Sequence, residues 1–256
     1  MHWVRSQNCL RMENKRCYVL LLVALLQWGC YKEKNVPQDQ VILRAGHLPV
    51  ATAADGVSKV LISVEINPAA TDASNSVLLT TTKGLFDIVA KNTVTLVAQS
   101  VLGANGENHK IATVNLVSTT DTVPAIITAT VKNFSRLDTV LFARAYPTLL
   151  RVTTDKLIYL PASNGEVTVT VNVRREVGMG VPTLGQFITL EALDQNNVAI
   201  GNFRNKTVVT DAAGNCVNFF SMPTPNSYVG IVKFRTTTVK DAAGNLLTDS
   251  TIINIR

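Results

Sequence analysis

The sequence contains few charged and few aromatic residues. Asp, Glu, Lys and Arg make up 16% of the 256 residues and hydrophobic residues 46%, so the chain is not a disordered tail. Aromatic residues make up only 6%, and the two tryptophans, Trp3 and Trp28, both precede residue 30. Val, Ile, Leu and Thr are abundant instead, which favours β-strands. The length allows one large domain or two ordinary ones.

A dense cluster of basic residues is also missing. The formal net charge is +6. Five charged residues before residue 30 supply +3 of it: Arg5, Arg11, Lys15, Arg16 and Glu13. The other +3 is spread over the rest of the chain, so a nucleic-acid-binding role has little support.

Histidine is scarce, because only His47 and His109 follow residue 30. They are far apart in the sequence and stand among loop-like residues, so we expect surface histidines rather than a triad or a zinc site. Acidic residues show no paired spacing typical of glycosidases. The stretches Gly103–Asn108 and Val177–Gly185 precede no expected helix, so we expect loop tips rather than phosphate-binding loops. The sequence therefore predicts no enzyme, no catalytic residue, no cofactor and no metal.

The apolar run near the N-terminus is short. Cys17–Leu26 has about ten residues, too few to span roughly 30 Å of hydrocarbon. A basic stretch before it and Gly29 after it are typical of a secretory signal. Cys30, directly after Gly29, resembles the lipobox cysteine of bacterial lipoproteins, which is lipidated and becomes the mature N-terminus. The alternatives are an N-terminal anchor or a plain signal peptide cut elsewhere.

This resemblance implies a signal peptide over 1–29, a lipid on Cys30 and a polar tether over 30–40. It places the protein on the outer membrane or cell surface of a Gram-negative bacterium, with the membrane as its partner through the anchor. Of the four cysteines, only Cys216 then remains, so no internal disulfide can form. We expect Cys216 to be a small buried hydrophobe rather than a reactive thiol.

Beyond residue 40, apolar and polar residues alternate with period two. The stretches Val60–Ile66, Ala125–Asn133 and Glu166–Arg175 each place apolar side chains on one face. This pattern is typical of antiparallel sheets with one buried face. Turn residues recur every 8–12 positions or so, which indicates sandwiches. We expect an all-β protein of two sandwiches, 41–145 and 146–256, with the boundary near Tyr146–Pro147 because proline resists continuing a central strand.

Several strand motifs carry a resemblance to a known family. "LLTTTKGLF" (Leu78–Phe86), "IATVNLVSTT" (Ile111–Thr120) and "AIITATVKN" (Ala125–Asn133) stand in the order of the invasin/intimin-type bacterial immunoglobulin-like repeat. The resemblance covers most of 41–145 and is weaker over 146–256. It implies tandem antiparallel immunoglobulin-like β-sandwiches used as a stalk or adhesive module. Asn218 stands where the family has an inward apolar residue, which leaves a different register or a β-bulge as explanations.

The pentapeptide "DAAGN" occurs twice, at 211–215 and 241–245. An EF-hand loop needs a glycine at position six and a distal glutamate, and both stretches lack them. As a turn, the Asp can accept a backbone hydrogen bond and the Gly can adopt a positive φ. We therefore predict turns and no calcium site, with 207–210 and 215–220 as the two strands of a hairpin around the first.

The loop Ser221–Tyr228 carries Met222 and Tyr228, which would form a contact patch if exposed, or cover the open end of the core. The leading hypothesis is a monomeric lipid-anchored surface protein that acts in adhesion, towards a surface protein or glycan, or as a spacer. The alternative is a glycan-binding accessory lipoprotein of a nutrient-uptake system. The scarcity of tryptophan after Trp28 counts against it.

Overall fold

The computed structural model describes residues 41–69, 75–104, 106–163, 165–225 and 228–256. Residues Val41–Arg256 belong to one compact unit. Within the described residues the structure consists of strands and one short 3₁₀ helix, η3 (Pro161–Ser163), with no α-helix. The predicted all-β class is therefore confirmed.

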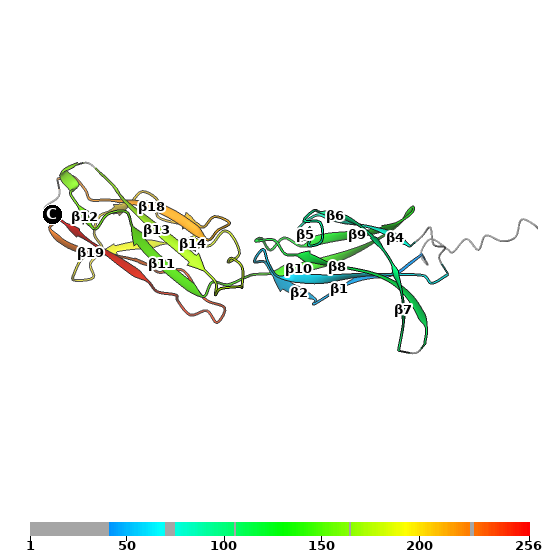
Figure 1. The fold of residues 1–256 in the computed structure, drawn as a ribbon. Coiled ribbons are helices and arrows are strands. Elements are labelled where there is room, and N and C mark those ends of the chain that lie inside the picture. The colour runs from blue at the N-terminus through cyan, green and yellow to red at the C-terminus, as the bar shows by residue number, and fades with distance from the viewer. Residues whose placement is uncertain (1–40, 70–74, 105, 164, 226–227) are drawn as a thin grey trace, which may run out of the picture. The chain divides into compact units, whose positions relative to one another are not determined.

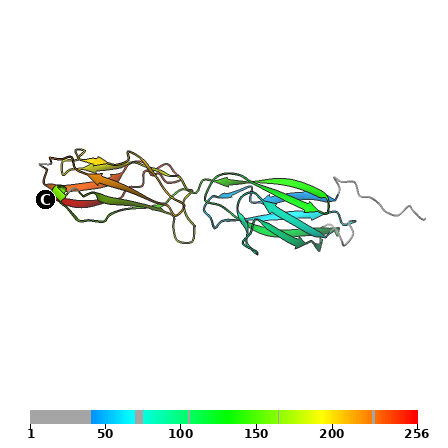
Figure 2. The same cartoon turned by 90° about the horizontal axis from the view of Figure 1, so that it is seen from above.

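The first ten strands form two facing sheets, here called the first sandwich (Figures 1 and 2). They are β1 (Ile42–Leu48), β2 (Ala51–Ala53), β3 (Lys59–Ile66), β4 (Ser76–Thr81), β5 (Leu85–Phe86), β6 (Thr93–Val97), β7 (Gln99–Leu102), β8 (Asn108–Val117), β9 (Ala125–Val131) and β10 (Phe134–Ala143). One sheet has the order β1-β3-β8-β5, with β7 also paired to β8, and the other has the order β2-β10-β9-β4-β6. Every pairing is antiparallel except that of β2 with β10.

The remaining strands form the second sandwich. They are β11 (Leu149–Thr154), β12 (Ile158–Tyr159), β13 (Val167–Arg174), β14 (Phe187–Ile188), β15 (Leu190–Leu193), β16 (Asn202–Phe203), β17 (Val208–Val209), β18 (Asn215–Ser221), β19 (Gly230–Thr236) and β20 (Ser250–Ile255). Its sheets have the orders β11-β13-β18-β16 and β12-β20-β19-β15, and β14 pairs with β17 separately. The segment between β10 and β11 contains Tyr146–Pro147, where the sequence places the boundary between domains.

The alternating sequence explains both cores. Successive strand residues point to opposite faces, so β3 buries Val60, Ile62, Val64 and Ile66 completely or nearly so. In β13 the four valines at alternate positions, from Val167 to Val173, are fully buried in the same way. Burial of one such side chain stabilises the fold by about 1.5–3 kcal/mol. Burial of these faces drives the sheets of each sandwich together.

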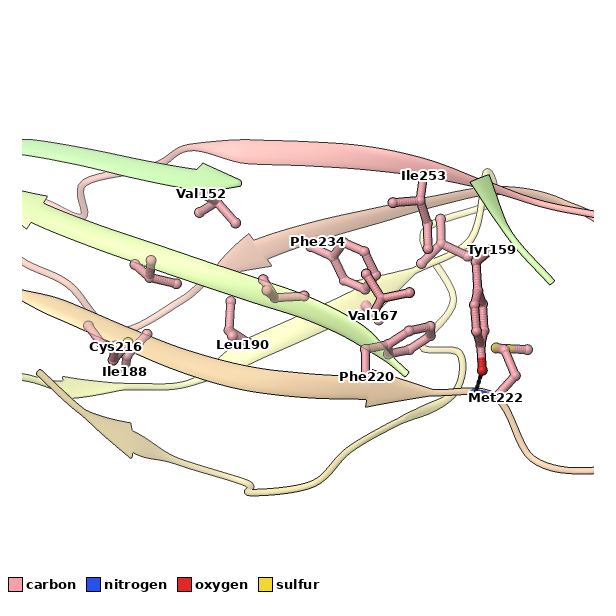
Figure 3. Close-up of a cluster of buried hydrophobic side chains, with 14 of the residues drawn as sticks. Val152, Tyr159, Val167, Ile188, Leu190, Cys216, Phe220, Met222, Phe234 and Ile253 are labelled. Atoms are coloured by element: carbon pink, nitrogen blue, oxygen red, sulfur yellow. Dashed lines mark hydrogen bonds between the residues drawn. The ribbon is translucent and has the colours of Figure 1, made fainter. Parts of the chain in front are cut away.

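Aromatic side chains gather at one end of the second core. Phe203, Phe220 and Phe234 contact one another, with ring centroids 4.9–5.8 Å apart. Tyr159 approaches Phe220 edge-on at 6.3 Å. Its hydroxyl donates a hydrogen bond to Gly165 O at 2.8 Å and accepts a longer one, 3.4 Å, from the backbone N–H of Met222 (Figure 3). These contacts close that end of the core.

Candidate binding surfaces

The two DAAGN stretches form the same turn. In the first, Asp211 Oδ1 accepts hydrogen bonds from the backbone N–H groups of Ala213 and Asn215, both at 2.9 Å. Gly214 has a φ of 78°. Residues 241–245 repeat both bonds at 2.9 and 2.8 Å, and their glycine has a φ of 85°. The predicted turn is confirmed, because the carboxylate holds the backbone and glycine supplies the left-handed conformation.

The hairpin predicted around the first of these turns is wrong. Strand β17 pairs with β14, whereas β18 pairs with β13 and β16. Thr210 extends the pairing of β17, since its backbone N–H donates to Gln186 O and its hydroxyl accepts from Gln186 N, both at 3.0 Å. The turn reverses the chain, but the strands on its two sides join different sheets.

The loop-like residues around the two histidines predicted surface positions, but both histidines lie in strands and are partly buried. His47 is in β1, with its Nδ1 2.6 Å from Asp138 Oδ2 and a side chain only 13% exposed. His109 is in β8, with its Nδ1 2.6 Å from Glu65 Oε1. Each histidine thus ties two strands together through one carboxylate. In the part of the chain that the structure describes, no three His, Cys, Asp or Glu side chains form a group that could hold a metal ion.

Cys216 and Met222 are core residues. The Cys216 side chain is buried. This burial, with the nearby Asp211 carboxylate, raises the pKa of the thiol to about 11, so it stays protonated at neutral pH. The prediction of a buried cysteine is confirmed. Met222 is 7% exposed, and Tyr228 packs partly against the same core, with its hydroxyl donating to Ile231 O at 2.8 Å. Met222 therefore offers little surface to a partner.

Asn218 is an inward-facing polar residue, 1% exposed, between Cys216 and Phe220 on the buried face of β18. The pairing of β18 with β13 runs without a shift across it, so neither a bulge nor a changed register explains it. Its Nδ2 donates to Asn205 O at 2.8 Å and its Oδ1 accepts from Asn205 N at 3.2 Å. The side chain thus satisfies both backbone groups of Asn205, which follows β16, and anchors that loop to the core.

The signal peptide 1–29, the tether 30–40 and the lipidated Cys30 lie outside the described residues. In the described ranges, no helix has the length and apolarity needed to cross a membrane. Lipidation at Cys30 remains a prediction.

The glycine-bearing segment Val177–Gly185 is not the free loop tip expected from its sequence. Thr183 Oγ1 donates to Ala54 O at 3.1 Å and accepts from Ala145 N at 2.7 Å. Val181 N donates to Asp55 O at 3.0 Å. The segment, which links β13 to β14, is thus bonded to residues that follow β2 and β10.

Asp55 is the polar centre of these contacts and is only 2% exposed. Its carboxylate accepts hydrogen bonds from Val57 N, Ser58 N, the Ser58 hydroxyl and the Ser118 hydroxyl, at 2.8–3.1 Å. Arg175 completes the set with an ion pair of 2.6 Å. Sequence reasoning missed this pair, since the two residues are 120 positions apart. Asp55 beside the positive-φ Gly56 marks a turn, but does not indicate its distant partner.

A hollow of about 620 Å³ lies on the outer face of the sheet β11-β13-β18-β16. Most of its polar lining comes from alternate outward positions of three adjacent strands: Arg151, Thr153, Thr170, Asn172, Arg174 and Asn215. Asp249, which precedes β20, adds a carboxylate. Arg151 stands opposite Asn172, which stands opposite Asn215. Sequence reasoning missed this surface as well, because it is assembled from three strands that are not all consecutive in the chain.

No known protein family and no curated protein matches the sequence. Among solved structures, the chain is similar to the adhesin InvE of Yersinia pseudotuberculosis, with a TM-score of 0.50 and 17% identity over 83% of this chain and 58% of that one. It is also similar to invasin, described as a bacterial integrin-binding protein, with a TM-score of 0.56 and 17% identity over 83% of this chain and 38% of that one.

These likenesses identify the fold. The protein is an all-β protein with immunoglobulin-like domains, similar in fold to the immunoglobulin-like domains of bacterial adhesins. The predicted immunoglobulin-like fold is confirmed. The chain spans less than two thirds of the length of either adhesin, so their activities and partners are not transferred with the fold.

Proposed function

We propose that this protein is a lipid-anchored protein of the bacterial surface whose immunoglobulin-like sandwiches act in adhesion or as a spacer. The observation that carries the proposal is the combination of an adhesin-like fold with a lipobox-like Cys30. The lipid holds the chain at the outer membrane through the polar tether 30–40, and the sandwiches present their outer faces to partners. In this proposal the protein acts as a monomer and not as an enzyme.

The internal bonding of the sandwiches supports a binding or spacing role. Several titratable side chains pair with one another and so link different parts of the sandwiches. His47 pairs with Asp138, His109 with Glu65, and Asp55 with Arg175. The thiol of Cys216 is buried and protonated. A protein that binds through its surface needs only a stable scaffold and an accessible face.

Protease digestion of intact cells tests the surface location. We expect an added protease to remove the protein from intact cells while a periplasmic marker survives, because the sandwiches face outwards. A lysed sample shows that the protease can digest both. Protection of the protein until lysis would place it in the periplasm and overturn the surface proposal.

A further inference from the structure

We propose that the hollow on the outer face of β11-β13-β18 binds an acidic glycan, that is, a carbohydrate bearing carboxylate or sulfate groups. The proposal deepens the proposed function, because it names the class of ligand to which the protein adheres. It rests on the proposed function for the adhesive role only. It is carried by the charge and hydrogen-bonding capacity of six side chains from three strands.

Two arginines provide the charge. Arg151 on β11 stands opposite Asn172 on β13, and Arg174 lies two residues further along β13 on the same face. Diagonal neighbours of this kind are about 7–8 Å apart, and like charges so placed repel each other. Both side chains are exposed, and among the described residues neither guanidinium makes a hydrogen bond or an ion pair. An anionic group between them would relieve this repulsion.

Among the described residues, one acidic side chain lines the hollow, and it already accepts a structural hydrogen bond. Asp249 Oδ2 accepts a hydrogen bond of 2.7 Å from the backbone N–H of Val152, on the outer edge of β11. It thereby satisfies a donor of an edge strand that has no further strand beside it. The hollow keeps an excess of positive charge, and guanidinium groups bind carboxylate and sulfate oxygens with pairs of parallel hydrogen bonds.

The amides and hydroxyls that line the hollow beside the arginines can form hydrogen bonds with the hydroxyls of a sugar. Asn172 donates to the Oδ1 of Asn215, which leaves the Asn172 carbonyl and the Asn215 amino group as an acceptor and a donor at the surface. Thr153 and Thr170 stand opposite each other and add two hydroxyls. The Thr153 hydroxyl donates a long hydrogen bond of 3.5 Å to Thr170 O and keeps its capacity to accept. Amides and hydroxyls both donate and accept, as sugar hydroxyls do.

The residues that line the hollow also favour an acidic glycan over a neutral one. Among the described residues no aromatic side chain lines the hollow, so the stacking platform common in neutral glycan sites is missing there. The apolar contribution comes from Leu149, which is 54% exposed, and from the partly buried Leu150. Affinity must then come from the charged pair. An acidic peptide lacks the dense hydroxyls that the amide and threonine rows would bind, which favours a glycan as the occupant.

Binding of defined polymers to the full chain, purified in detergent, tests the proposal. The immobilised protein is presented with polygalacturonate, which carries carboxylates, with dextran sulfate, with neutral dextran and with polyglutamate as an acidic peptide. We expect saturable binding of at least one charged polymer and none of dextran. We also expect a weakening with added salt, since exposed charges are screened. The polymer that binds more tightly identifies the anionic group.

Matched variants locate the site. We expect Arg151→Gln and Arg174→Gln each to weaken binding at least tenfold, with unchanged circular dichroism because both side chains are exposed. Arg44→Gln removes the same charge from an exposed position in the first sandwich and should leave binding unchanged.

Three results would overturn the proposal: no binding of either charged polymer, an equal loss in all three variants, or preferential binding of polyglutamate. The last would indicate a peptide ligand. None of these results bears on surface location or anchoring, so failure of the glycan site is distinguishable from failure of the proposed function.

Discussion

At the scale of single residues, two glycines in identical pentapeptides have different surroundings. A Cβ added to Gly214 would lie 2.2 Å from Val173 O, whereas one added to Gly244 would meet no atom within 4 Å. The Gly214 carbonyl also accepts a hydrogen bond of 2.8 Å from Val173 N. The first turn is therefore packed against β13, and the second is open to solvent.

This difference predicts unequal costs for the same substitution. Gly244→Ala should lower the free energy of unfolding by about 1–2 kcal/mol, the cost of a left-handed conformation for a residue with a Cβ. Gly214→Ala should cost distinctly more, because the backbone of β13 must also move. Thermal unfolding of the two purified variants measures the difference. Equal shifts in their melting temperatures would contradict the packing of the first turn.

A polar side chain can be buried where its polar atoms have hydrogen-bond partners. Asn218 keeps its place in an apolar face because both groups of its amide bond to the backbone of Asn205. The alternation in β18 predicted its inward direction. The sequence did not reveal the partner thirteen residues away.

At the scale of elements, Asp55 links the turn between β2 and β3 to the end of β8 and to Arg175, which follows β13. Burial by itself would raise the pKa of Asp55. Hydrogen bonds from Ser58, Val57 and Arg175 outweigh this effect, so that the pKa lies below its ordinary value of 3.8. The carboxylate is therefore more easily protonated in the unfolded chain than in the folded one.

This shift predicts how stability depends on pH. A carboxyl group whose pKa is lower in the folded state stabilises the fold fully above its unfolded pKa, and loses this effect as pH falls through the folded pKa. The Asp55 contribution should be complete at neutral pH, begin to fall as the pH approaches the ordinary value of 3.8, and continue to fall towards the lower pKa of the folded state. Asp55→Asn should lower stability by about 3 kcal/mol at pH 7, because it leaves the Arg175 charge without its partner.

Chemical unfolding between pH 7 and pH 3 measures this effect. The Asp55→Asn variant should show a weaker acid-induced loss of stability than the wild type. Glu107→Gln, at an exposed position in the loop between β7 and β8, is the control and should follow the wild-type profile. An Asp55→Asn profile parallel to that of the wild type would refute the role of this carboxylate.

At the scale of the whole molecule, burial and hydrogen bonds hold the described residues together, and no disulfide joins any of them. Cys216 is the one cysteine in the described residues, and its thiol is buried with a pKa of about 11. Cross-linking of two chains through this thiol is therefore unfavourable. In the proposed function, attachment to the membrane depends on the N-terminal segment, for which Cys30 is the predicted site.

A single substitution tests that attachment. Cys30→Ala should abolish incorporation of a radiolabelled or clickable fatty acid and shift the protein from the membrane fraction to the soluble fraction, because acyl chains anchor by about 0.8 kcal/mol per buried methylene group. Cys9→Ala, within the predicted signal peptide, should leave labelling unchanged. Unchanged labelling of Cys30→Ala would contradict the lipoprotein hypothesis.

The sequence by itself determined the class of structure and the local geometry. Alternation of side chains, as in Val60–Ile66, is a property of each strand alone, and the Asp and Gly of each DAAGN stretch specify their turn within five residues. Only the tertiary structure decided which strands become neighbours. It pairs β17 with β14, joins Asp55 to Arg175 and brings Arg151 beside Arg174. Such contacts depend on the register and order of strands far apart in the chain, and a local pattern does not encode that order.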